Sequence, residues 1–166
     1  MDPLISIQRY LSALRSGASA STVLFPEQRR QFRVVLTGGV FDVIHPGHLH
    51  TLNEARKAGA NASGKPVVLV VVVSTDENVA KRKGREPLHS AAERSALVEA
   101  LKPVDLAIVG VSRWQDTLAR VAPDVVVFGY DQTPMPLPDE IKVVHLTSHG
   151  ANPNSKTGKV RDRLGF

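Results

Sequence analysis

The run Val67-Val68-Leu69-Val70-Val71-Val72-Val73 is the longest apolar stretch in the 166-residue chain. It does not alternate between apolar and polar residues, so it predicts a strand buried on both faces, as in a parallel sheet. Further short strands are expected at 34–36, 106–109, 125–128 and 141–146, with helical patterns at 46–58, 91–101 and 114–121. This alternation predicts an α/β fold with a doubly wound, mainly parallel, five-stranded sheet.

The length fits one domain with one core. Apolar residues at helical spacing predict a further helix over 4–15, and the small polar stretch 17–22 predicts a loop. We therefore divide the chain into an N-terminal helical arm, residues 1–31, and a main domain, residues 32–166. The arm is expected to pack on the domain or to mediate dimerisation, and no catalytic role is assigned to it. A last helix is expected to begin near Ser155 or Thr157.

Composition limits the classes of function. The formal charge of +5 and pI near 9.8 favour an anionic partner. Aromatic residues make up only 5% of the chain, which favours a small phosphorylated molecule over nucleic acid. The absence of cysteine excludes disulfides and thiolate chemistry. Neither a membrane span nor a signal peptide is recognisable, so we expect a soluble cytoplasmic protein with no membrane partner.

The densest chemical signal is Thr37-Gly38-Gly39-Val40-Phe41-Asp42-Val43-Ile44-His45-Pro46-Gly47-His48, which follows one strand and opens a helix. Glycines allow the backbone to approach a ligand closely, and free N–H groups at a helix start bind anions. The two histidines around the Pro-Gly turn place two imidazole donors near one phosphate. Such donors stabilise the charge that develops during phosphoryl transfer.

Two other interpretations of this segment are weaker. It is neither a Walker A loop nor a Gly-x-Gly-x-x-Gly dinucleotide fingerprint. His45, His48 and His50 make a poor zinc site, since Asp42 is the one acidic residue in the segment. We therefore predict no metal-ligating residues and place His50 on the surface of the new helix.

The Gly39-Val40-Phe41-Asp42 turn followed by His45-Pro46-Gly47-His48 resembles the signature of the cytidylyltransferase-like nucleotidyltransferase superfamily. The resemblance covers roughly residues 33 to 163 and implies a Rossmann-like nucleotidyltransferase fold. Within the superfamily the chain looks most like the archaeal FAD synthases. The stretches 81–87, 99–105 and 122–127 carry this likeness, as does Gly129-Tyr130-Asp131-Gln132, where related glycerol-phosphate enzymes carry Gly-Asp-Asp-Trp.

The resemblance implies transfer of AMP from ATP to FMN, giving FAD and pyrophosphate, with Mg²⁺ bound through phosphates. His45 and His48 would be catalytic. The residues expected to bind the nucleotide are Gly39, Val40, Phe41, Asp42, Pro46, Gly47, Gly129, Asp131, Ser155 and Thr157. Family members commonly have Thr in place of Val40, so a hydroxyl contact is absent and backbone contacts remain. The Ser/Thr run at 154–159 is looser than usual, and no Arg precedes it.

Several side chains have both a functional and a structural interpretation. We expect Lys83 and Arg94 to bind the acceptor or its phosphate. The basic run 81–85, which contains Lys83, also fits a solvated loop. Arg94 also fits an ion pair on the surface of a helix. Asp42 fits either a phosphate-orienting role or turn formation. Trp114 and Phe128 fit either stacking on a ring or, more simply for Phe128, core packing.

Three functions remain open at this stage. The first is FAD synthase. The second is a CTP-dependent cytidylyltransferase acting on glycerol 3-phosphate or another alcohol phosphate. The third is a nucleotide- or nucleic-acid-binding module without catalysis, against which the intact His45 and His48 argue. A homodimer is a reasonable expectation from the superfamily.

Overall fold

The computed structural model describes residues 2–60, 64–111, 113–148, 159 and 162. Five strands form one sheet in the order β3-β2-β1-β4-β5, and every neighbouring pair is parallel. The strands are β1 (Arg33–Gly39), β2 (Val67–Val73), β3 (Leu106–Val109), β4 (Val125–Phe128) and β5 (Lys142–His145). The predicted α/β class and the five-stranded parallel sheet are confirmed.

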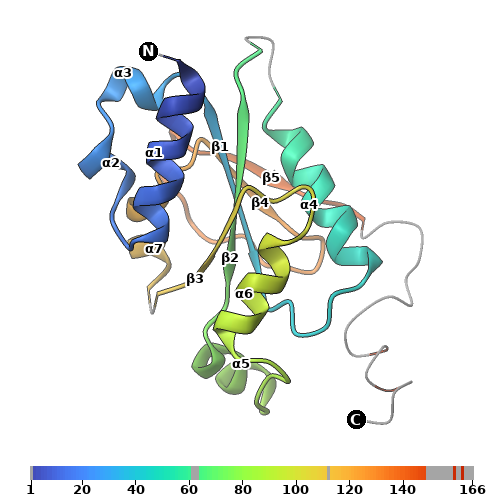
Figure 1. Ribbon diagram of the computed structural model, residues 1–166. Helices are drawn as coiled ribbons and strands as arrows, with labels where there is room; N and C mark the ends of the chain where they lie inside the picture. Colours follow the sequence, from blue (N-terminus) through green and yellow to red (C-terminus); the bar gives the residue numbers. More distant parts are fainter. Residues whose placement is uncertain (1, 61–63, 112, 149–158, 160–161, 163–166) are drawn as a thin grey trace.

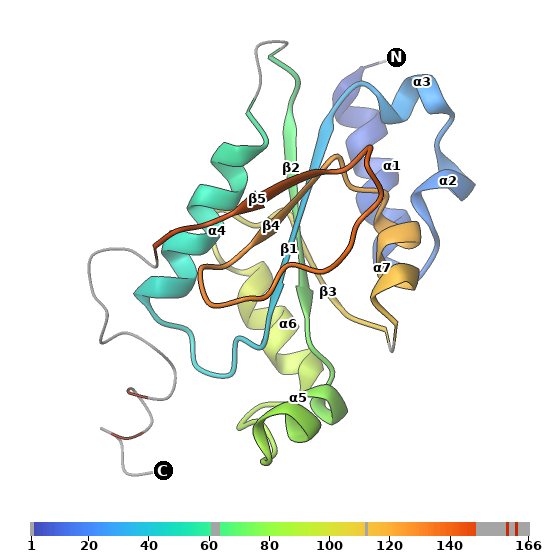
Figure 2. The ribbon, with the colours of Figure 1, turned by 180° about the vertical axis from the view of Figure 1, so that it is seen from behind.

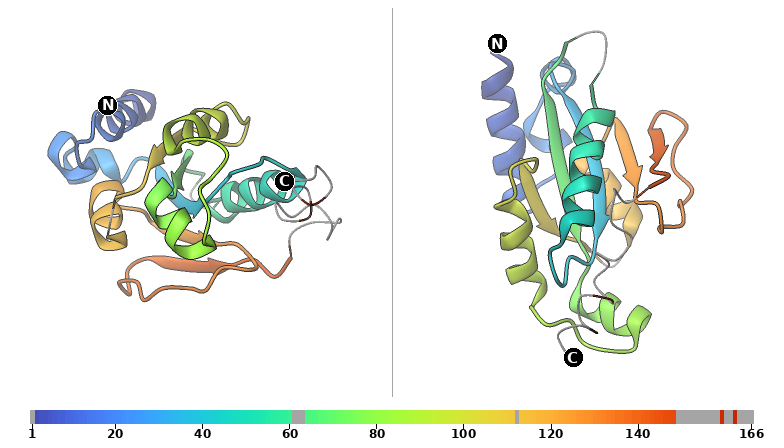
Figure 3. Two further views of the ribbon diagram at one scale, coloured as in Figure 1. Left: turned by 90° about the horizontal axis from the view of Figure 1, so that it is seen from below. Right: turned by 90° about the vertical axis from the view of Figure 1, so that its right-hand side faces the viewer.

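Helices cover both faces of this sheet (Figure 1). The helices of the main domain are α4 (Pro46–Ala58), α5 (Asp76–Lys83), α6 (Ala91–Glu99) and α7 (Trp114–Val121). Three more precede β1, namely α1 (Pro3–Arg15), α2 (Ala20–Val23) and α3 (Pro26–Arg29). The N-terminal helices and α7 lie on one side of the sheet and α4 on the other (Figure 3).

Strand β2 is buried on both faces because its valines point alternately to two cores. Val68, Val70 and Val72 belong to the core that α1 and α7 cover, whereas Leu69 and Val71 belong to the core under α4 and α6. This is the arrangement expected of a central parallel strand with helices on both sides. The non-alternating apolar run is thus explained by its place in the middle of the sheet.

The N-terminal helices pack against the main domain. Tyr10 of α1 is fully buried and its hydroxyl donates to the carbonyl of Val121 at the end of α7, at 2.8 Å. Arg29 pairs with Asp124 at 2.8 Å and lies over the Phe32 ring. The division of the chain at residue 31 stays a prediction.

Two features of the helices differ from the expectation. One interpretation of the basic run 81–85 was a solvated loop, but the stretch after β2 forms helix α5. Thr75 caps the start of this helix by accepting a hydrogen bond from the Asn78 N–H. Gly84 ends α5 in the left-handed conformation at φ 66°. A short helix, α2, also occupies part of the loop predicted at 17–22. The helix predicted near Ser155 lies outside the described residues.

The carboxyl ends of the strands point towards the edge of the sheet at which α5 lies, at the bottom of Figure 1 and again at the bottom of Figure 2. Loops from β1, β2, β3 and β4 meet there. In doubly wound sheets the ligand binds at this edge, where the strand order reverses direction. In this sheet the reversal lies at β1, between β2 and β4.

Candidate active site

Two cavities open at the carboxyl edge of the sheet. The first, of about 330 Å³, contains the predicted phosphate loop and the β4 exit: Gly39, Phe41, His45, His48, Lys83 and Asp131 are among its lining residues. The second, of about 470 Å³, lies between the exits of β1, β2, β3 and β4 and has a more apolar wall. The two share Gly38, Gly39, Arg82, Asp131 and Gln132 in their linings, so they meet above the end of β1.

The loop after β1 has a tight and strained backbone. Phe41 has a positive φ of 54°, which is costly for a residue with a bulky side chain. A Cβ atom at Gly39 would lie 2.9 Å from the Phe41 ring, so no other residue fits at that position without rearrangement. The backbone of Gly39 and Val40 is thereby kept open to the first cavity, as expected for a close approach to a ligand.

His45 and His48 lie side by side at the start of α4. His45 is the N-cap residue, and Pro46 occupies the first turn, where its missing N–H costs nothing. The two imidazole rings are stacked, with centroids 3.8 Å apart and planes inclined by 23°. Both histidines and Gly47 line the first cavity, whereas Pro46 shapes the helix start from outside that lining. The predicted pair of imidazoles is therefore brought together at one helix N-terminus.

The environment of His48 keeps its ring neutral. Burial, followed by the neighbouring His45 and Lys83, lowers the pKa of His48 to about 3. Its Nδ1 is buried and has no hydrogen-bond partner among the described residues. An unpaired buried N–H is unfavourable, so the proton is expected on Nε2. The ring can then donate one hydrogen bond from Nε2 as a neutral group.

The exit of β4 forms a turn that Gln132 ties to β1. The Gln132 side chain accepts from the Gly129 N–H at 2.8 Å and donates to the Gly38 carbonyl at 2.7 Å. Gly129, Asp131 and Gln132 line the first cavity, and Asp131 is exposed at its edge. In the sequence Gln132 stands out only through the likeness of its segment, because a long-range bond of this kind has no signal in sequence.

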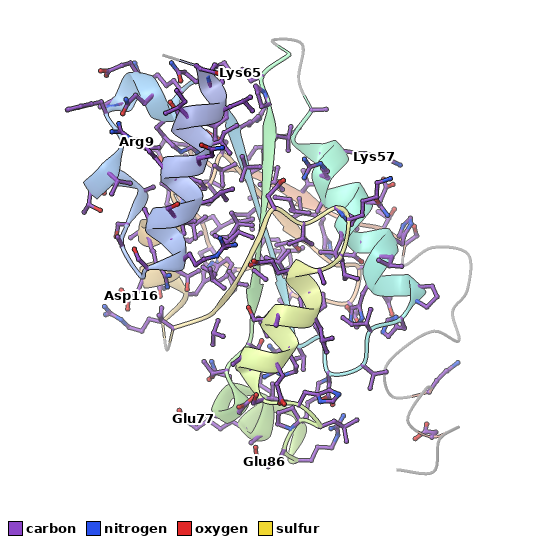
Figure 4. All side chains as sticks on the ribbon, viewed as in Figure 1. Arg9, Lys57, Lys65, Glu77, Glu86 and Asp116 are labelled. Atoms are coloured by element: carbon purple, nitrogen blue, oxygen red, sulfur yellow. The ribbon has the colours of Figure 1, made fainter. Side chains whose placement is uncertain are left out.

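The basic residues near α5 have different surroundings. Arg82 and Lys83 line the first cavity. Burial and the neighbouring Arg85 lower the pKa of Lys83. Arg85 instead pairs with Asp42 at 3.1 Å, and Lys81 pairs with Glu77 on the outer face of α5, where Glu77 lies at the tip of the molecule (Figure 4). The structure thus separates two cavity-lining cations from two that are paired elsewhere.

The structure places the Arg94 side chain away from both cavities. Its side chain is fully buried, and its guanidinium donates to the carbonyls of Val40, Ser74 and His89 and to the Asp76 carboxylate. It lies outside the lining of both cavities. Arg94 therefore holds the loops after β1 and β2 and the segment before α6 together, and its fully buried guanidinium presents no exposed donor to either cavity.

Asp42 has a similar structural place. It is 2% exposed, and its carboxylate accepts from the Leu88 N–H at 2.6 Å and from Arg85. It contributes to neither cavity lining. Asp42 therefore anchors the β1 loop to the segment before α6, and its contact with a nucleotide stays a prediction.

The second cavity combines an apolar wall with small polar groups. Trp114, Phe128 and Met135 contribute apolar surface, and Thr75 and Asn78 contribute polar atoms. Phe128 is 5% exposed and belongs to the core, which confirms its packing role, and its stacking on a ring stays a prediction. Ser155 and Thr157, predicted to bind the nucleotide, lie outside the described residues.

Comparison with known proteins identifies the family. Residues 36–151 match the cytidylyltransferase-like family. The chain belongs to this family. It is 52% identical over 99 residues to an FAD synthase of Methanopyrus kandleri, and 38% identical over 107 residues to an FAD synthase of Thermococcus sibiricus. These alignments cover 59% and 63% of this chain.

The chain spans 63% of the length of the Methanopyrus protein and 67% of that of the Thermococcus protein. It is also similar to a solved structure, a lipopolysaccharide core biosynthesis protein of Thermoplasma volcanium, with a TM-score of 0.57 and 34% identity. That match covers 69% of this chain and 95% of the other. The cytidylyltransferase-like core of the family is therefore present in this chain.

None of the helices that the structure describes has the length and apolar character needed to cross a membrane. Within residues 2–60, 64–111 and 113–148, no three acidic or histidine side chains are grouped closely enough to hold a metal ion.

Proposed function

We propose that this chain is a nucleotidyltransferase that transfers AMP from ATP to FMN, giving FAD and pyrophosphate. The observation that carries the proposal is the pair of cavities that meet above Gly38 and Gly39. One contains the imidazole pair and a helix start, which suit a triphosphate. The other offers space and apolar surface for a ring system. The likeness to two FAD synthases supports the same reaction.

In this proposal ATP occupies the first cavity. The Nε2–H group of His48, together with His45, donates to oxygens of the α-phosphate, where negative charge grows in the transition state. The exposed backbone at Gly39 and Val40 contacts the nucleotide, and Asp131 lies where sugar hydroxyls pass. Lys83 offers positive charge to the departing pyrophosphate. None of these groups forms a covalent bond to the substrate, as is usual for direct phosphoryl transfer.

Mg²⁺ fits this site through the substrate. Magnesium is commonly held by one or two carboxylates together with substrate phosphates. The phosphates and water would supply the ligands, because Asp131, the acidic residue in the described lining of the two cavities, is placed beside the sugar in this proposal. The ion would neutralise charge on the triphosphate.

The size of the second cavity favours a large acceptor. At about 470 Å³ it is within the range of pockets for ring-containing ligands, and Trp114, Phe128 and Met135 supply the apolar contacts that such ligands require. Glycerol 3-phosphate would leave most of this space empty and would gain little from an apolar wall. This comparison favours FMN over the CTP-dependent alternative.

The test is a matched set of three reactions. Purified protein with Mg²⁺ is incubated with FMN and ATP, with FMN and CTP, and with glycerol 3-phosphate and CTP, while pyrophosphate and the nucleotide product are measured. FAD formed in the first mixture alone is the expected result. Product in the third mixture alone would show that the substrates are glycerol 3-phosphate and CTP, not FMN and ATP. No product in any mixture would contradict the proposed activity with these substrates.

A further inference from the structure

The junction between the two cavities contains a cation, Arg82, to which the family likeness assigns no role. The five residues common to both linings are Gly38, Gly39, Arg82, Asp131 and Gln132. The glycines form the floor, and Gln132 is occupied by its bonds to Gly129 and Gly38. Arg82 is the cation among the five. Any two ligands that react across this junction therefore meet next to a residue that lines both cavities and carries a positive charge.

The surroundings of Arg82 leave its donors available. Among the described residues it makes no ion pair or hydrogen bond, whereas Lys81 pairs with Glu77, Arg85 pairs with Asp42, and Arg94 is buried. Lys83 lines the first cavity but not the second. Of the described cations around this edge of the sheet, Arg82 is thus the one that lines both cavities.

The fold also fixes where Arg82 stands. Helix α5 starts at the Thr75 cap directly after β2 and ends at Gly84, so Arg82 lies in its last turn. The first turn of α5 is held by the bond between Asp76 and the buried Arg94, at 2.6 Å. A guanidinium carries several N–H groups in a planar fork, which can bind two phosphate oxygens at once.

We propose that Arg82 is a further catalytic residue, which bridges the phosphate of the acceptor and the α-phosphate of the nucleotide during transfer. This inference rests on the proposed function. An oxygen of the acceptor phosphate forms a new bond to the α-phosphorus, while the bond from that phosphorus to the pyrophosphate oxygen breaks and its electron pair leaves with pyrophosphate. The total charge is unchanged. Arg82 offsets the repulsion between the two approaching anions.

Arg82→Ala, Arg82→Lys and the matched control Lys81→Ala test the proposal. Lys81 is adjacent and also basic, but it is paired with Glu77 and lies outside both cavity linings. We expect Arg82→Ala to lower kcat about 100-fold, as for the loss of one transition-state donor. Arg82→Lys is expected to be intermediate, because it keeps the charge and loses the fork. Lys81→Ala is expected to retain the wild-type kcat.

Binding of each substrate alone gives the second readout. Because Arg82 reaches both cavities, Arg82→Ala is expected to weaken the binding of ATP and of FMN, each by a few-fold, while the thermal unfolding temperature stays within a few degrees of wild type. A kcat of Arg82→Ala within twofold of Lys81→Ala would overturn the inference, as would a loss confined to the KM of one substrate.

Failure of the proposed function can be distinguished from failure of the Arg82 inference. If the wild-type protein makes no FAD but joins another nucleotide and phosphorylated acceptor, the same three variants are measured with that pair. A loss for Arg82→Ala there supports the bridging role without FMN, and equal rates for all three variants overturn it.

Discussion

His45 and His48 stack because a helix start places residues three apart on the same side, and the Pro-Gly pair between them keeps the turn tight. The rings repel one another if both are charged. The lowered pKa of His48 removes that repulsion by keeping its ring neutral over the physiological range of pH. A neutral imidazole still donates a hydrogen bond, so the stacked pair can act on a phosphate without two adjacent positive charges.

Replacement of either histidine is expected to reduce turnover with little effect on folding. His45→Ala and His48→Ala should each lower kcat by about 100-fold or more, because each removes a donor to the charge of the transition state. His50→Ala is the matched control, since His50 lies on the same helix outside both cavity linings. Unchanged turnover in His45→Ala and His48→Ala would contradict the mechanism.

His48 also makes stability depend on pH. Its folded-state pKa of about 3 lies below the ordinary value of 6.5, so the unfolded chain binds more protons between these limits. The contribution of His48 to the free energy of unfolding is therefore intact above pH 6.5 and falls as the pH decreases, by at most about 1.4 kcal/mol per pH unit. Denaturant titrations between pH 6.5 and 5, where most carboxylates remain ionised, measure this slope.

His48→Asn is the comparison for these titrations, because Asn does not titrate. We expect a shallower dependence on pH in His48→Asn than in wild type. Equal slopes in the two proteins would mean that the ring of His48 is protonated as easily in the folded state as in the unfolded chain.

At the residue scale, sequence could predict the imidazole pair and could not predict the fate of Arg94 and Asp42. The His-x-Gly-His spacing is local, so a helix start brings its members together in any case. Whether Arg94 points into a cavity or under a loop depends on Val40, Ser74 and Asp76, which lie 54, 20 and 18 residues away along the chain. The residues next to a charged residue on a helix do not indicate whether distant parts of the chain will bury it.

At the scale of elements, strands β1 to β4 were predictable because parallel strands buried on both faces give uninterrupted apolar runs, whereas the edge strand β5 is mostly exposed. Helix α5 was missed because it carries a single buried apolar residue, Val79, and so has no amphipathic pattern. The sequence features that indicate this helix lie at its two ends. Thr75 precedes two acidic residues in the first turn, and three basic residues precede Gly84, which together suit the helix dipole.

Gly84→Ala is expected to destabilise the protein by about 1–2 kcal/mol, because a Cβ is unfavourable at φ 66° even where the surrounding space is open. It should also lower kcat, since the last turn of α5 carries Arg82 and Lys83. Gly17→Ala is the matched control, because Gly17 has φ 89° in open space at the end of α1. Both variants should lose stability in denaturant titrations, and only Gly84→Ala should lose activity once folded.

At the scale of the whole molecule, α1 completes the layer that covers one face of the sheet. Leu14 is fully buried in that core, whereas Leu4 in the same helix is 63% exposed. Leu14→Ala is therefore expected to lower the free energy of unfolding by about 2–5 kcal/mol, and Leu4→Ala to change it little. Thermal and denaturant unfolding of the two variants measure the difference. Equal stabilities would show that α1 detaches readily from the sheet.

The shared floor of the two cavities has a consequence for the end of the reaction. A product in which the two substrates are joined is a bivalent ligand: each half holds the other at a high effective concentration over its own cavity. Dissociation then requires both halves to leave together. We expect such a product to compete with both substrates and its release to limit turnover, visible as a rapid first turnover followed by a slower steady rate.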